Sequence, residues 1–238
     1  MTQLTPFHGE TPDNFNTRCL CVLVLDTSYS MSGGPIDELN KGLTGYGEYL
    51  KSKNSTRFSV ETAIITFDSK VTCVQEPVLI DDMKDSTTFP LKVGGTTKLV
   101  DGMRMAIKKV EERKNWYRNN GIAYYRPWVV LITDGFPDPD QNINGLIDEV
   151  KIADKGKHFA FLPMGVVGSD PTFLSKIATP EFPPLPIDWK HFDEFFSWLS
   201  NSMDKVSQSA EGEVVKFDSV ESFALSGWGG GNFTQTSI

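Results

Sequence analysis

The fold is decided by the apolar run Cys19-Leu-Cys-Val-Leu-Val-Leu25 and the polar segment Asp26-Thr-Ser-Tyr-Ser30 that follows it directly. A short, continuous apolar run that ends in polar residues is typical of a fully buried strand. Oxygen-bearing side chains then occupy positions i, i+2 and i+4, at Asp26, Ser28 and Ser30. Open α/β sheets bind their ligands just beyond the carboxyl ends of such strands. The segment therefore predicts a buried strand with a ligand site at its end, and its hard oxygen donors suit a Mg²⁺-type cation.

Strand and helix patterns alternate along most of the remaining chain. The expected strands span residues 19–25, 57–67, 71–80, 128–133 and 158–167, and the expected helices begin near residues 35, 98, 143, 172 and 192. Strands separated by helix-length segments predict a mostly parallel sheet that is covered on both faces. The short link Asp68-Ser-Lys70 makes the 71–80 strand an antiparallel neighbour, as such sheets often carry at an edge. We therefore predict an α/β fold of three layers, doubly wound and Rossmann-like, with one antiparallel edge strand and helices on both faces.

The 238 residues are enough for one sizeable domain. We expect an irregular lead-in over residues 1–17, the domain itself over residues 18–210, and a C-terminal extension or tail over residues 211–238. Within that tail, residues 214–220 read as an extra strand. The glycine-rich residues 228–232 read as flexible chain.

The charge balance and the cysteines limit the classes of partner. The formal net charge is −8, which disfavours binding to nucleic acid or to an anionic membrane surface because the phosphate-neutralising cations are missing. No apolar run approaches membrane-spanning length, and the first residues lack the layout of a signal peptide. The three cysteines are few, odd in number and placed in strand-like runs, which favours reduced core residues. We expect a cytoplasmic protein with no nucleic-acid or membrane partner.

Two further loops have the same position relative to predicted elements as the first. Thr97 directly precedes the helix that begins near residue 98, and Asp134 follows the buried strand 128–133. If the 19–25 and 128–133 strands are neighbours with helices leaving to opposite faces, their carboxyl ends form the ligand crevice of the sheet. We therefore predict that one divalent cation is bound by Asp26, Ser28, Ser30, Thr97 and Asp134. Mg²⁺ is the first choice, with Mn²⁺ or Ca²⁺ as alternatives, and an exchangeable position on the ion can take a partner's carboxylate.

Each of these residues also has an ordinary structural explanation. The first-loop residues can cap turns before the helix that starts at Pro35, Thr97 can be a helix N-cap, and Asp134-Gly135 is a common turn dipeptide. Taken singly, these explanations are at least as good as metal binding. It is the joint occurrence, at the ends of predicted strands and the start of a helix, that favours a metal site.

Three of these segments, in this order and spacing, resemble the metal-ion-dependent adhesion site of von Willebrand factor type A domains. The matching segments are Asp26-Thr-Ser-Tyr-Ser-Met31, Gly94-Gly-Thr-Thr-Lys-Leu99 and Leu131-Ile-Thr-Asp-Gly135, and the resemblance covers roughly residues 18–208. It implies the same five metal ligands, with Thr97 preferred over Thr96, and metal-dependent docking of an acidic residue from a protein partner without catalysis. One departure is Tyr29, where glycine is commoner in the family; it is not a ligand position.

Other segments are similar to the bacterial tellurium-resistance TerY-like subfamily. They are Ser32-Gly-Gly-Pro35, the run from Arg126 to Gly135, Pro183-Pro-Leu-Pro186, the phenylalanine-rich stretch that begins at Phe192, and Gly227-Trp228. This resemblance implies a role in stress or tellurite-resistance systems, sometimes alongside a kinase and a phosphatase.

Two alternative functions remain open at this stage. A Mg²⁺-dependent phosphoryl-transfer enzyme would use a strand-end aspartate as nucleophile, but it needs a second aspartate where this chain has Ser28. Ser hydrolase and P-loop motifs are also absent from the sequence. A structural scaffold would occupy its own metal site, with Asp218 or Glu221 of the tail folding back onto the ion.

Overall fold

The strand β1 (Cys19–Asp26) is buried along its whole length and lies inside a sheet of six strands. The computed structural model describes residues 11–84, 87, 90–169, 171–210, 213–220 and 234–236. The sheet order is β3-β2-β1-β4-β5-β6, and only β3 runs antiparallel to its neighbour. The other strands are β2 (Val60–Phe67), β3 (Val71–Leu79), β4 (Trp128–Thr133), β5 (Ala160–Val166) and β6 (Leu185–Ile187). The predicted mostly parallel sheet with one antiparallel edge strand is confirmed.

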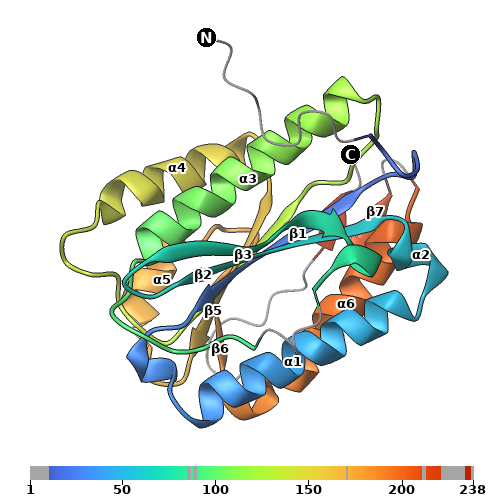
Figure 1. Cartoon of the computed structure of the whole chain (residues 1–238). Coiled ribbons are helices and arrows are strands. Elements are labelled where there is room, and N and C mark those ends of the chain that lie inside the picture. Colours follow the sequence, from blue (N-terminus) through green and yellow to red (C-terminus); the bar gives the residue numbers. More distant parts are fainter. Residues whose placement is uncertain are drawn as a thin grey trace.

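Helices cover both faces of the sheet, which gives the three predicted layers (Figure 1). The helices α1 (Gly34–Lys51) and α6 (Phe192–Gln208) lie on one face. The other face carries α3 (Leu99–Asn119), α4 (Ile143–Lys155) and α5 (Pro171–Ile177). Alternate residues of β1 supply the two cores, because successive strand side chains point to opposite faces: Leu23 packs on the α1 side and Val24 on the α3 side.

Glycine within α1 has a packing reason that the sequence does not reveal. A Cβ at Gly42 would lie 2.3 Å from a ring carbon of Phe196 on α6. The ring of Phe196 in turn packs edge-on against Tyr46 of α1, with 6.0 Å between ring centroids. Glycine weakens an isolated helix, but it is required at position 42 because α1 and α6 approach closely there.

One predicted boundary was wrong, and two features were not predicted. The strand expected from residue 57 begins only at Val60, which pairs with Cys19 at the start of β1, and Arg57 instead ends the short helix α2 (Asn54–Arg57). The proline-rich segment near residue 185 contains β6, an edge strand in which proline is tolerated. The helix α3 runs on to Asn119, well past its last clearly periodic apolar residue, because Trp116 and Tyr117 pack in a separate small cluster.

The C-terminal part contributes to the core at the end of the sheet away from the candidate site. The predicted strand over 214–220 is shorter, since β7 (Val214–Lys216) pairs with β8 (Thr234–Thr236) in a separate two-stranded sheet. Beyond it, the ring of Phe217 packs edge-on against Trp128, the first residue of β4, with 5.0 Å between centroids. Residues 228–232, predicted to be flexible, lie outside the described residues.

A buried ion-pair network fastens β2 to α3 and to the lead-in. The Glu61 carboxylate accepts hydrogen bonds from Arg18 Nε at 3.0 Å, Arg113 Nε at 2.6 Å and Tyr117 Oη at 2.7 Å. All four residues are at most 2% exposed. Two guanidinium groups and a hydroxyl thus donate hydrogen bonds to the Glu61 carboxylate. They compensate its buried negative charge in place of water.

Candidate metal centre

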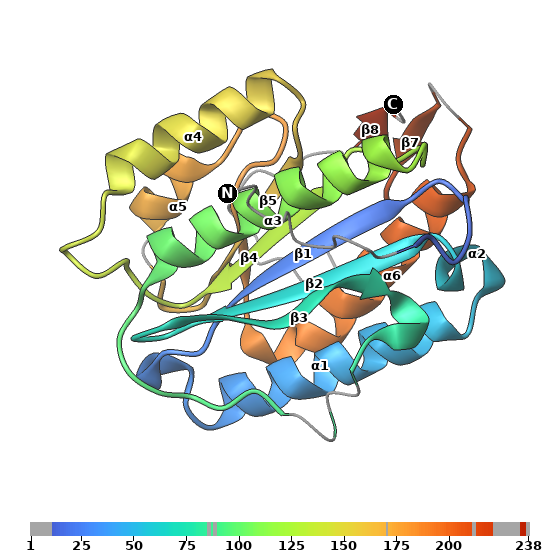
Figure 2. The ribbon, with the colours of Figure 1, turned by 45° about the horizontal axis from the view of Figure 1, so that its top comes forward.

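The three predicted loops meet at the carboxyl end of the parallel strands. In the described residues, β1 pairs with β4 in parallel, from Cys21 opposite Trp128 to Leu25 opposite Ile132, so their ends lie side by side. The chain leaves β1 toward α1 on one face and leaves β4 toward α4 on the other. Figure 2 shows the turn after β1, the start of α3 and the loop after β4 together at the left side of the molecule. This is the switch-point crevice at which open α/β sheets bind ligands.

Four of the five predicted residues form a continuous chain of contacts. Asp26 Oδ1 accepts the backbone N–H of Ser28 at 2.8 Å. The hydroxyl oxygens of Ser28 and Ser30 lie 3.0 Å apart, and Ser30 donates to Asp134 Oδ1 at 2.7 Å. These contacts bring Asp26 and Asp134, which are 108 positions apart in sequence, into one cluster of oxygen atoms.

The fifth residue, Thr97, faces the same point. A Cβ built on Gly135 would lie 3.6 Å from Thr97 Oγ1 and 3.8 Å from Asp26 Oδ2. Gly135 thus leaves a small space bounded by that hydroxyl and that carboxylate. Thr97 is not the N-cap of α3, because Lys98 occupies that position. The structure therefore brings all five predicted residues to one place.

The five residues of the cluster differ in their exposure to solvent. Asp26 and Ser28 are buried, Asp134 and Thr97 are half-buried, and Ser30 is exposed. Burial raises the pKa of Asp26 to about 6, against hydrogen bonds from Ser28 and Thr133, and the nearby charge of Asp134 adds to the rise. Burial also raises the pKa of Asp134, opposed by the hydrogen bond from Ser30. No positively charged group is among the described contacts that shift the pKa values of these two acids. Burial therefore raises both pKa values without a cation to oppose it.

Backbone contacts dock the second loop against the first. The N–H of Gly94 donates to the carbonyl of Thr27 at 2.8 Å, and the N–H of Tyr29 donates to the carbonyl of Gly95 at 3.3 Å. Gly95 has a φ of +66°, and a Cβ there would lie 2.0 Å from the hydroxyl of Ser69. Only glycine fits this backbone conformation and this close approach, so the Gly94-Gly95 pair sets the distance between the loops.

The family model of the von Willebrand factor type A domain matches residues 21–184, which include all five clustered residues. The chain belongs to the von Willebrand factor type A domain family.

Solved structures of the same family share the fold at low sequence identity. A von Willebrand factor type A protein from Catenulispora acidiphila is 14% identical, with a TM-score of 0.63 over 84% of this chain and 45% of that one. The pilus adhesin SpaC from Lactobacillus rhamnosus GG, in its open conformation, is 12% identical, with a TM-score of 0.65 over 85% of this chain and 34% of that one.

The von Willebrand factor domain of the type V pili tip protein Mfa5 from Porphyromonas gingivalis is 12% identical, with a TM-score of 0.61 over 83% of this chain and 99% of that one. The chain thus spans less than half the length of two of these neighbours. No curated protein matches it significantly.

Sequence reasoning missed two residues that hold the cluster in place. Thr133, the last residue of β4, donates its hydroxyl to Asp26 Oδ2 at 2.6 Å. Asp138 lies in the loop after β4 and accepts hydrogen bonds from the second loop, at Thr96 Oγ1 and the Thr97 N–H. Burial alone would raise the pKa of Asp138, but these hydrogen bonds and nearby Lys98 lower it. The sequence feature that could have indicated Asp138 is its position between two prolines, in the same short loop as Asp134.

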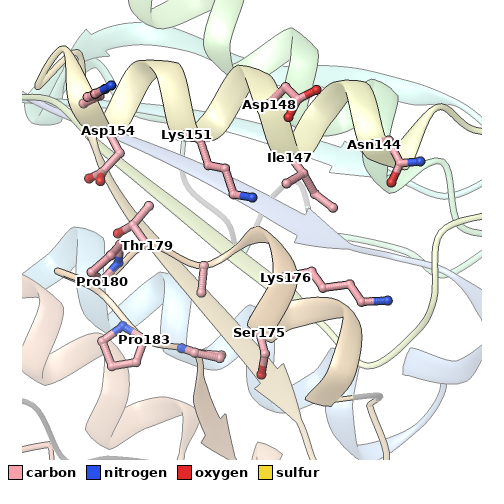
Figure 3. Close-up of a pocket in the computed structure, with 13 residues that line it drawn as sticks. Asn144, Ile147, Asp148, Lys151, Asp154, Ser175, Lys176, Thr179, Pro180 and Pro183 are labelled. Carbon is pink, nitrogen blue, oxygen red and sulfur yellow. The ribbon is translucent and has the colours of Figure 1, made fainter.

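A separate open groove of about 1010 Å³ lies between α4, α5 and the segment that follows α5 (Figure 3). Its walls carry Lys151 and Lys176 beside Asp148 and Asp154, together with several prolines. Charges of both signs line it, and among the described residues none of the five clustered side chains does. The groove is therefore distinct from the candidate metal centre.

One alternative from the sequence, the scaffold that occupies its own metal site, can be compared with the described residues. Asp218 does not fold back onto the cluster: its carboxylate pairs with Lys205 of α6 at 2.8 Å, and its carbonyl accepts from Trp198 Nε1 at 2.9 Å. That part of the self-occupied scaffold was wrong, and Glu221 lies outside the described residues. No described helix has the length and apolar character needed to span a membrane.

Proposed function

We propose that this domain is a metal-ion-dependent protein interaction module. In it, Asp26, Ser28, Ser30, Thr97 and Asp134 hold a divalent cation, Mg²⁺ first and Mn²⁺ or Ca²⁺ as alternatives, and a protein partner docks through a carboxylate. The observation that carries the proposal is the gathering of these five oxygen-bearing side chains from three loops at the switch point of the sheet.

The donor set fits such an ion. Every candidate donor is an oxygen, which is the ligand type that Mg²⁺, Mn²⁺ and Ca²⁺ prefer. Two carboxylates offset the charge of a dication, and their raised pKa values are what two acids without a counter-charge show in a partly dry pocket. The described residues hold no group of three or more His, Cys, Asp or Glu side chains suited to a metal, so the hydroxyl oxygens of Ser28, Ser30 and Thr97 would have to complete the ligand set beside the two carboxylates.

The protein's own residues have three tasks in this proposal. Thr133 and the Ser28 backbone orient the buried carboxylate of Asp26. The serine and threonine hydroxyls supply neutral oxygens, so that these three ligands add no further negative charge against an incoming anion. When bound, the ion supplies an electrophilic position that takes the partner's carboxylate.

Exposed aromatic side chains beside the cluster support docking of a protein. Tyr29, between the two ligand serines, is 71% exposed, and Phe136, two residues after Asp134, is 51% exposed. The ring of Phe136 is supported from below by Phe173, with 6.1 Å between centroids. Aromatic residues are enriched at protein interfaces, where they contribute much of the binding energy. An acidic partner segment with apolar neighbours would match this surface.

The biological setting is the finer part of the proposal. The TerY-like resemblance of several segments favours a stress or tellurite-resistance-type system, and pilus adhesins among the structural neighbours favour an interaction role for the fold. Phosphoryl transfer is disfavoured because the position of its general acid is Ser28, whose hydroxyl contacts Ser30 instead.

The test is partner capture that depends on the metal. The wild-type protein, immobilised with Mg²⁺, should retain a protein partner that a chelator releases and that Asp134→Ala does not retain. Asp140→Ala is the matched control, because Asp140 lies in the same loop, is exposed and contacts none of the five residues through the described hydrogen bonds. Capture that survives both the chelator and Asp134→Ala would contradict the proposal.

A further inference from the structure

The geometry points to Asp138 as a positioning residue that sets Thr97 against the candidate metal centre. Its Oδ1 accepts the N–H of Thr97 at 3.1 Å, and its Oδ2 accepts the hydroxyl of Thr96 at 2.7 Å. Its own backbone N–H donates to the carbonyl of Thr97 at 3.0 Å. Three hydrogen bonds from one residue therefore bracket the Thr96–Thr97 dipeptide. This inference rests on the proposed function, because it concerns the aim of one of the five ligands.

Thr97 needs such a partner because its segment belongs to no regular element. The residues from Pro90 to Lys98 lie before the start of α3 at Leu99, and the N-cap residue Lys98 forms no side-chain cap bond. The backbone groups of Thr97 thus have no helix or strand ladder to fix them, and Asp138 binds both its N–H and its carbonyl. Fixing a backbone on both sides of one Cα fixes the direction of its Cα–Cβ bond, and hence the side from which the side chain approaches the cluster.

The contact also joins two ligand loops. Asp138 lies four residues after Asp134 in the loop that follows β4, so the hydrogen bonds tie Thr97 to the segment that carries another ligand. Gln141, further along the same loop, adds a second tie, because its Oε1 accepts the N–H of Val100 at 2.8 Å. The distance between Thr97 and Asp134 is therefore set by direct contacts between their loops.

The side chain of Asp140 provides a matched comparison in the same loop. Both Asp138 and Asp140 lie near Lys98 Nζ, at 3.6 Å and 2.7 Å. Only Asp138 has described hydrogen bonds to Thr96 and Thr97. Removing either acid deletes one negative charge from the loop, but only removal of the Asp138 carboxylate frees the Thr97 N–H and the Thr96 hydroxyl, while the backbone bond from residue 138 to the Thr97 carbonyl stays.

The experiment measures Mg²⁺ affinity by calorimetry and, in metal-free protein, hydrogen exchange at the Thr97 amide. Asp138→Ala should weaken Mg²⁺ binding about tenfold, as the loss of a residue that orients a metal ligand typically does, and should speed exchange at that amide. Asp138→Asn should recover part of the affinity, because its amide oxygen still accepts a hydrogen bond. Asp140→Asn should bind within about twofold of wild type, since an exposed charge at this distance is screened.

A double-mutant cycle separates positioning from general loop stability. If Asp138 acts through Thr97, then Asp138→Ala should cost no further affinity in a Thr97→Val background. The inference is overturned by wild-type affinity in Asp138→Ala, by an equal loss in Asp140→Asn, or by fully additive losses in the cycle. A wild-type protein that binds no Mg²⁺ overturns the proposed function, and this inference with it, whereas Mg²⁺ binding lost in Asp26→Ala but kept in Asp138→Ala overturns this inference alone.

Discussion

The buried carboxylate of Asp26 should lower the stability of the metal-free protein at neutral pH. Burial raises its pKa from 3.8 to about 6, so above that pH the folded state holds an ionised acid that solvent does not reach. A difference of about two in pKa corresponds to roughly 3 kcal/mol at about 1.4 kcal/mol for each tenfold change in equilibrium constant. The substitution Asp26→Asn removes this charge and keeps the size of the side chain.

The sign of the effect follows from proton binding. Between pH 3.8 and about 6 the folded state binds more protons at Asp26 than the unfolded state does, so the contribution of Asp26 to the free energy of unfolding falls as pH rises. Asparagine has no such dependence. The free energy of unfolding of Asp26→Asn, minus that of the wild type, should therefore rise by roughly 2 kcal/mol between pH 4 and pH 7. At pH 4 the variant should be equal or less stable, because its amide offers only one acceptor oxygen to Thr133 and the Ser28 N–H.

The assay is urea unfolding with a chelator present, followed by circular dichroism at pH 4, 5, 6 and 7. Taking the difference between variant and wild type cancels the other titrating groups. A flat difference for Asp26→Asn would refute the reasoning, because it would mean that the carboxylate loses no hydration on folding.

Three further predictions concern the pH dependence of Mg²⁺ binding, the second loop and the buried ion-pair network. Mg²⁺ affinity, measured by calorimetry at several pH values, should weaken progressively below about pH 6, because protons compete for carboxylates with raised pKa values. Constant affinity down to pH 5 would contradict the proposed ligands. Gly95→Ala should lose about 2 kcal/mol in chemical unfolding, since a positive φ and the contact with Ser69 both oppose a Cβ, and a loss below 0.5 kcal/mol would argue against the loop geometry. Glu61→Gln should cost about 3 kcal/mol in the same assay, because two buried guanidinium groups lose their counter-charge, and unchanged stability would show that the network is dispensable.

Periodicity and strand-end chemistry predicted five of the six strands of the main sheet and the grouping of the five oxygen-bearing residues. The apolar run before Asp26 has one plausible structure, and oxygen-bearing residues after two such runs meet at one edge whenever those strands pair. The pairing of β1 with β4 supplied that condition. Because the five residues sit at element boundaries, their positions followed from the elements themselves.

What the sequence could not predict depends on tertiary contacts. The glycine at position 42 reads as a helix defect until Phe196 is seen against it. The edge strand β6 is hidden by prolines, which remove the usual strand pattern. Asp138 reads as a turn residue, because nothing local shows that its carboxylate reaches back to a loop some forty residues earlier. Each of these depends on a partner distant in sequence.

The metal dependence of this site can be measured by calorimetric titration of Mg²⁺ into metal-free protein. The wild type should show one saturable site, with an affinity at least about tenfold weaker in both Asp26→Ala and Asp134→Ala and an unchanged affinity in Asp140→Ala. Circular dichroism of each variant checks that the fold survives. Wild-type affinity in both Asp26→Ala and Asp134→Ala, or no saturable binding in the wild type, would contradict the claim that these loops form a metal-dependent docking site.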